Sequence, residues 1–128
     1  MNEPRPPKSS WRTKFANAWR GIGVGVRGQN SFLVHVPVAI LVVVLAAILN
    51  LEMTRFCLLL LCIGAVVTAE LFNSSLESMA RAVTGQHNDD IRDSLDVASG
   101  AVLTISIFAA IVGAILLGFG IVAFFVGQ

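Results

Sequence analysis

Charged side chains are scarce in this sequence, and a long stretch near its end has none. Only 13% of the 128 residues are Asp, Glu, Lys or Arg, whereas 55% are hydrophobic and the mean hydropathy is +0.79. Residues 97–127 contain no ionisable side chain. Soluble domains average about 25% charged residues, so this composition argues against a soluble globular protein and favours a single domain embedded in a membrane.

The sequence also has few cysteines, a small net charge and no phosphate-loop motif. Cys57 and Cys62 lack the spacing of a zinc site and are expected to be packing residues. The glycines of residues 21–28 do not form a Walker pattern. The net charge is only +1, and we expect no nucleic-acid partner.

Three hydrophobic stretches predict three transmembrane helices. They cover residues 32–51, 56–69 and 97–127. The first and third hold the roughly 20 apolar residues that span a bilayer, while the second starts near Met53 and is expected to continue as helix through Glu77. The first begins too late, and is too long, to be a cleaved signal peptide. We therefore expect an all-α membrane protein with spans at about residues 31–50, 53–84 and 91–126.

Basic residues lie almost entirely on one side of these spans. Of the nine Lys and Arg residues, only Arg55 lies between the first and second hydrophobic stretches. The others precede the first stretch or lie between the second and third, and such an excess is typical of cytoplasmic segments. We expect a multi-pass protein of the bacterial inner membrane, with the N-terminus in the cytoplasm and the C-terminus outside.

The segment before the first span predicts a tail and a surface helix. Three prolines within residues 1–10 favour a disordered tail ahead of a single domain, residues 11–128. From Trp11 onward apolar residues recur at three- and four-residue steps, which predicts an amphipathic helix over about 11–28 in the cytoplasmic interface. Gly25 and its neighbouring glycines indicate a bend or a close backbone approach just before the first span.

The most informative pattern is the set Glu70, Asn73 and Glu77. At 3.6 residues per turn, seven residues rotate only about 20° from two whole turns, so all three side chains share one helix face. Residues 56–69, which precede Glu70, carry no charge. A carboxylate at that depth is costly, and in membrane segments such a group usually faces a bundle interior or a wet cavity and marks function. The plain alternative is a carboxylate that only marks the end of a span.

More acidic residues precede the third span, and Asp89 or Asp90 is the expected N-cap of that helix. Carboxylate oxygens near a membrane surface suit Mg²⁺, which takes one or two of them and leaves its other positions to phosphates and water. Phosphoryl transfer needs such a metal and a base that accepts the hydroxyl proton. The residues therefore permit, without requiring, phosphate transfer to a lipid alcohol.

The run Ala69-Glu-Leu-Phe-Asn-Ser-Ser-Leu-Glu77 resembles the signature of the prokaryotic diacylglycerol kinase and undecaprenol kinase family. The resemblance extends through Trp19-Arg-Gly21, residues 30–35 and residues 96–103, and covers about residues 11–125. It implies a surface helix plus three spans, assembled as a homotrimer with active sites shared between protomers. It also implies transfer of the γ-phosphate of MgATP to a membrane lipid alcohol, diacylglycerol or undecaprenol.

The resemblance also implies roles for individual residues. Glu70 would be the general base on the lipid hydroxyl, and Glu77 would hold Mg²⁺ with the nucleotide phosphates. Asn73 would orient the phosphates or the base, and Asp96 would belong to the nucleotide side. His35 matches a histidine of undecaprenol-kinase-like members, and we expect it to be neutral and hydrogen-bonded.

Two positions depart from the family pattern. Gln29 stands where a metal-binding glutamate is usual, although an amide oxygen can still coordinate, and Leu95 stands where a phosphate-binding lysine is usual. Arg92 lies near Asp96 on the same helix side and is expected to take over the task of that lysine. Two alternatives stay open: a degenerate member that only binds nucleotide or lipid, and a small ion-translocating or scaffold subunit.

Overall fold

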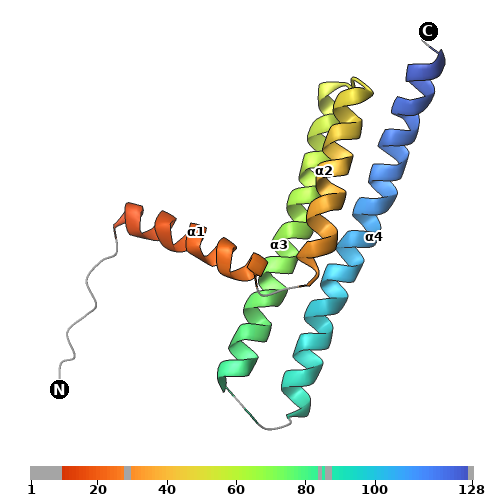
Figure 1. Ribbon diagram of the computed structural model, residues 1–128. Helices are drawn as coiled ribbons and strands as arrows, with labels where there is room; N and C mark the ends of the chain where they lie inside the picture. Colours follow the sequence, from red (N-terminus) through yellow and green to blue (C-terminus); the bar gives the residue numbers. More distant parts are fainter. Residues whose placement is uncertain (1–9, 28–29, 84, 86–87, 127–128) are drawn as a thin grey trace, which may run out of the picture.

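The computed structural model describes residues 10–27, 30–83, 85 and 88–126, and its described secondary structure is entirely helical (Figure 1). The four helices are α1 (Trp11–Arg27), α2 (Phe32–Ile48), α3 (Met53–Val83) and α4 (Asp89–Val126). The expected all-α membrane architecture is thereby confirmed. The expected tail lies outside the described residues except for Ser10, and so does Gln29.

Helices α2, α3 and α4 run side by side along the same long axis (Figure 1). The α2–α3 connection and the C-terminal end of α4 lie at one end of this bundle, and the C-terminal end of α3 and the start of α4 lie at the other (Figure 1). Asn50, in the α2–α3 connection, has φ of 48°, the left-handed conformation that Asn tolerates in tight turns. This up-and-down order places the acidic start of α4 next to the polar end of α3.

Two of the described helices, α3 and α4, are each long and apolar enough to cross a membrane. Helix α2 has 17 residues, a rise of about 25 Å, and meets the same test only together with α1, as a pair bent by 107°. By length and composition, the described chain therefore has two spans, or three with the bent pair counted as one. The bend leaves α1 outside the bundle of α2, α3 and α4 (Figure 1).

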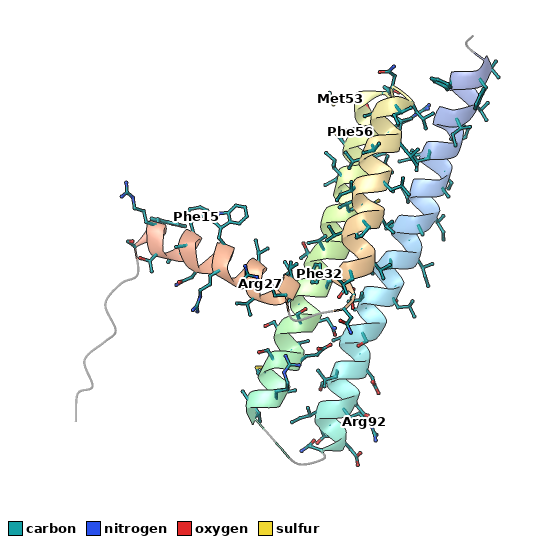
Figure 2. The ribbon with its side chains drawn as sticks, in the orientation of Figure 1. Phe15, Arg27, Phe32, Met53, Phe56 and Arg92 are labelled. Carbon is teal, nitrogen blue, oxygen red and sulfur yellow. The ribbon has the colours of Figure 1, made fainter. Side chains whose placement is uncertain are left out.

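Helix α1 has an apolar and aromatic side and no buried residue. Trp11 and Trp19 are 74% and 73% exposed, and Phe15 projects toward the end of the bundle that holds Met53 (Figure 2). Near its C-terminal end, a Cβ on Gly25 would lie 2.7 Å from Leu71 Cδ2 of α3. The close backbone approach expected at these glycines is therefore present at Gly25, where it holds α1 against α3.

The start of α4 differs slightly from the expected one. The Asn88 side-chain oxygen accepts a hydrogen bond from the Ile91 backbone N–H at 3.1 Å, so Asn88 caps the helix in place of Asp89 or Asp90. Both aspartates instead lie in the first turn, where a negative charge interacts favourably with the helix dipole. The expectation failed because Asn and Asp are nearly equivalent N-caps, and neighbouring candidates cannot be separated by type alone.

Candidate functional site

Helix α3 carries Glu70, Asn73 and Glu77 without a break, and its buried residues change from apolar to polar along its length. Leu59 and Val66 are buried in its first half, whereas Glu70, Asn73 and Ser74 are buried further on. The Ser74 hydroxyl donates to the Glu70 backbone carbonyl at 2.8 Å, which satisfies this hydroxyl inside the helix. The buried residues of α3 are therefore polar from Glu70 onward.

The Glu70 side chain is enclosed by the bundle. The residue is only 1% exposed, and its Oε1 lies 3.6 Å from Nε2 of His35 in α2. Its second oxygen, Oε2, is buried and has no hydrogen-bond partner among the described residues. Burying an unpaired carboxylate oxygen is costly. We therefore expect Oε2 to bond to a group that is not part of the described chain.

His35 connects three helices at this point. Its Nδ1 lies 3.3 Å from the Ser31 backbone carbonyl oxygen, and its Nε2 lies 3.4 Å from Ser106 Oγ in α4. Sequence reasoning did not include His35 or Ser106 among the site residues. The available signal was that His35 is the sole ionisable residue between positions 32 and 51.

Asn73 and Glu77 form a second polar group one to two turns further along α3. The Asn73 amide donates to Glu77 Oε1 at 2.9 Å, and Arg81 NH1 lies 3.7 Å from Glu77 Oε2. The Glu77 side chain is 29% exposed, while Asn73 Oδ1 is buried and has no hydrogen-bond partner in the described part of the chain. The expected proximity of Asn73 and Glu77 is therefore present.

Arg92 and Asp96 lie on the first turns of α4, at the end of the bundle near the α3–α4 connection (Figure 2). The Arg92 guanidinium contacts Asp89 at 3.1 Å and Asp93 at 3.3 Å, both on its own helix. Asp96 is exposed and makes no hydrogen bond or ion pair with the residues that the structure describes. These two side chains are exposed, and in the described part of the chain no hydrogen bond or ion pair joins them to Glu70.

Glu77 and Asn73 offer carboxylate and amide oxygens, the ligand type that Mg²⁺ requires, although the Arg81 guanidinium also lies 3.7 Å from Glu77 Oε2. Within the described ranges no three His, Cys, Asp or Glu side chains are grouped closely enough to hold a metal ion alone. Mg²⁺ commonly binds through one or two carboxylates together with substrate phosphates and water. The Glu77 carboxylate and the unpaired Asn73 oxygen fit that pattern.

Two cavities adjoin these groups. An apolar cavity of about 300 Å³ lies between α2, α3 and α4, with His35 and Ser106 among its few polar lining residues. A groove of about 690 Å³ lies between α1 and α3 and is lined by Arg20, Arg81 and several hydroxyl side chains. The cavity lies on the Glu70 side of α3, and its lining is apolar like the acyl-chain region of a membrane. The groove presents charged and hydroxyl side chains that are suited to binding an anion.

Comparison with known proteins gives a consistent result. Residues 16–117 match the family model described as prokaryotic diacylglycerol kinase. A diacylglycerol kinase of Synechocystis sp. is 32% identical over 117 residues, which cover 86% of this chain and 67% of that protein. An undecaprenol kinase of Bacillus subtilis is 27% identical over 99 residues, covering 77% of this chain and 80% of that protein.

Proposed function

This chain belongs to the prokaryotic diacylglycerol kinase family and is a membrane lipid kinase, and we propose that it transfers the γ-phosphate of ATP to the hydroxyl of diacylglycerol or undecaprenol. Its long apolar helices place it in a membrane. The proposal includes the bacterial inner membrane as the location, with the site at the cytoplasmic surface. The basic residues before α2, together with Arg81 in the last turns of α3 and Arg92 in the first turn of α4, support that orientation.

The observation that carries the proposal is the buried, unpaired Oε2 of Glu70. In our proposal this oxygen accepts the proton of the lipid hydroxyl. The O–H bond of the lipid breaks, its oxygen forms a bond to the γ-phosphorus, and the bond between that phosphorus and the leaving oxygen of ADP breaks. A general base of this kind contributes about 10²–10⁴-fold to a rate.

Glu77 and Asn73 support a nucleotide side one to two turns away. We propose that Glu77 holds Mg²⁺, with Gln29, which lies outside the described residues, as a further ligand. When bound, the metal would neutralise the charge on the phosphates. Asn73 donates to Glu77 Oε1 at 2.9 Å, which fixes the direction of that carboxylate and leaves its own Oδ1 free for a ligand.

The remaining cations and acids are assigned to nucleotide binding. We propose that Arg92 replaces the lysine that the family usually has at the position of Leu95, and that Asp96 belongs to the same region. The groove between α1 and α3 supplies two further guanidinium groups, Arg20 and Arg81, which are suited to phosphate oxygens.

We also propose that the active protein is a homotrimer. Many large apolar side chains of the bundle are exposed on the single chain, so lipid or neighbouring copies must cover them. One bundle also leaves the Glu77 side chain 29% exposed, which a neighbouring copy would enclose.

The test is phosphate transfer by purified protein in mixed micelles, with γ-labelled ATP, Mg²⁺ and either diacylglycerol or undecaprenol. We expect labelled lipid from at least one acceptor and, with Glu70→Gln, a loss of about 10²–10⁴-fold. Glu52→Gln is the matched control, because the Glu52 side chain is 69% exposed in the α2–α3 connection at the other end of the bundle. It should retain wild-type transfer.

A folded protein that binds MgATP but labels neither lipid would contradict catalysis. That result would favour a non-catalytic family member, a reading motivated by Gln29 and Leu95.

A further inference from the structure

His35 is a partly buried ionisable side chain, 24% exposed, to which the proposed phosphate transfer assigns no task. In place of the neutral ring expected from the sequence, we propose that a doubly protonated ring holds Oε1 of Glu70 and so directs Oε2 toward the lipid hydroxyl. His35 is then a positioning residue that acts through Glu70. This proposal rests on the proposed role of Glu70 as the base.

The atoms around the ring determine its protonation state. Nδ1 lies 3.3 Å from the Ser31 backbone carbonyl oxygen, which can only accept a hydrogen bond, so Nδ1 carries a proton. Nε2 lies 3.6 Å from Glu70 Oε1, and a base must be ionised before it can accept a proton. An ionised carboxylate is also only an acceptor. The state in which Glu70 can act therefore requires a proton on both ring nitrogens.

The alternative state is unfavourable. In a neutral ring protonated at Nδ1, the Nε2 lone pair would face the Glu70 carboxylate at 3.6 Å, in an interior where charges are poorly screened. With both nitrogens protonated, the imidazolium and the carboxylate form a pair with no net charge, which is less costly than leaving the buried carboxylate unpaired beside a neutral ring. Ser106 Oγ, 3.4 Å from Nε2, accepts from the same N–H.

Few other groups can balance this charge. From α3, the ionisable groups near the ring are Glu70 and the thiol of Cys62, which lines the same cavity. Helix α4 has no ionisable side chain after Asp96, and α2 has none besides His35 itself. The His35–Glu70 pair is thus electrically self-contained.

The pair also distinguishes the two oxygens of Glu70. Oε1 faces α2, whereas Oε2 is buried without a hydrogen-bond partner among the described residues. Holding Oε1 prevents the carboxylate from rotating and leaves one oxygen for the proton of the substrate. A misplacement of about 1 Å at a reacting group can cost roughly 100-fold in rate.

Enzyme kinetics test the positioning role. We expect His35→Ala to lower kcat about 100-fold and to leave KM for MgATP within about twofold, because the ring contacts Glu70 and not the Glu77 side. His35→Gln carries an amide N–H in place of Nε2–H and should recover about tenfold of that loss. Equal losses in both variants would overturn the proposal.

The pH profile separates positioning from packing. The proposal expects the kcat of the wild type to fall at alkaline pH, because a ring without its Nε2 proton would turn a lone pair toward the carboxylate. The Gln variant keeps its N–H at every pH, so this alkaline fall should be absent from its profile. Cys62→Ala is the control for the thiol and should retain the fall. An alkaline fall that persists unchanged in His35→Gln would contradict a charged ring.

Nitrogen NMR of ¹⁵N-histidine-labelled protein in micelles observes the ring directly. The chain has two histidines, so His87→Asn assigns the signals of His35. At the pH of maximal activity both nitrogens of His35 should carry protons, and in Glu70→Gln the ring should become neutral. A neutral ring in the active wild type would overturn the proposal even if Glu70→Gln abolishes transfer. If Glu70 does not act as the base, the Glu70→Gln variant should still transfer phosphate.

Discussion

Glu70 and Glu77 are the same residue type, two turns apart on one face of one helix, yet their surroundings differ. Glu70 is 1% exposed and contacts His35 of another helix. The Glu77 side chain is 29% exposed, and Asn73 and Arg81, both on its own helix, lie next to it. One carboxylate therefore depends on the packing of the bundle, and the other is supported by residues four positions away in the same helix.

This difference indicates how one helix can serve two chemical tasks. A buried carboxylate needs a partner to offset its desolvation, and here the partner comes from α2. A partly exposed carboxylate remains hydrated and can exchange water for a metal ion that carries the phosphates. We infer that proton transfer is assigned to the inner group and nucleotide binding to the outer one.

Among the substitutions on the nucleotide side, Glu77→Gln is expected to give the largest effect. The loss of its charge should lower kcat/KM for MgATP by about 10- to 150-fold, since one charged hydrogen-bonding group is worth about 1.5–3 kcal/mol. Nucleotide binding, measured by equilibrium dialysis, should weaken in this variant but persist in Glu70→Gln. If both variants bind MgATP equally well, the division of tasks between the two carboxylates is wrong.

Asn73→Ala should have a smaller effect, roughly tenfold on kcat/KM for MgATP, because it removes the hydrogen bond to Glu77 Oε1 but leaves the carboxylate in place. Assays over a range of Mg²⁺ concentrations measure it, and excess Mg²⁺ should restore part of the activity. Asn73→Asp sharpens the test, since it keeps an oxygen but removes the N–H donor. Wild-type Mg²⁺ dependence in Asn73→Ala would show that the amide does not support Glu77.

Arg92→Ala should raise KM for MgATP about threefold to fivefold, since exposed cations contribute about 1 kcal/mol or less. The guanidinium is 55% exposed and paired with acids on its own helix. Arg55→Ala, at the opposite end of the bundle, is the control and should leave KM unchanged. Equal effects of the two substitutions would reject Arg92 as the substitute for the usual lysine.

Gly120→Ala should change stability and leave catalysis almost untouched. A Cβ there would lie 2.5 Å from Leu51 Cδ2, and overpacking of this kind costs about 1–3 kcal/mol. Gly118→Ala is the matched control, because its Cβ would meet nothing within 4 Å. Thermal inactivation in micelles should shift only for Gly120→Ala. A loss of activity at low temperature would mean that the apolar end of the bundle influences the site directly.

The features that the sequence predicted are those contained within single helices. The shared face of Glu70, Asn73 and Glu77 follows from helical spacing, and apolar length indicated the all-α membrane architecture. The assigned roles of these residues, the Mg²⁺ site and the trimer remain predictions.

The contact between His35 and Glu70 was beyond sequence reasoning. The two residues are 35 positions apart, so their contact depends on how α2 rotates against α3, and no local periodicity encodes that rotation. For the same reason the burial of Asn73 Oδ1 and the local pairing of Arg92 with Asp89 and Asp93 became visible only in three dimensions.

Helix α3 is continuous from Met53 to Val83, and this continuity has a mechanical consequence. Glu70 and Glu77 are separated by a rise of about 10 Å. A stiff helix keeps this distance along its axis constant. In the proposed mechanism, the lipid hydroxyl and the phosphate chain must therefore come to fixed positions, and any adjustment between the two substrates must come from the substrates or from other helices. A ligand too short or too long for that distance would bind at one of the two carboxylates and would not react.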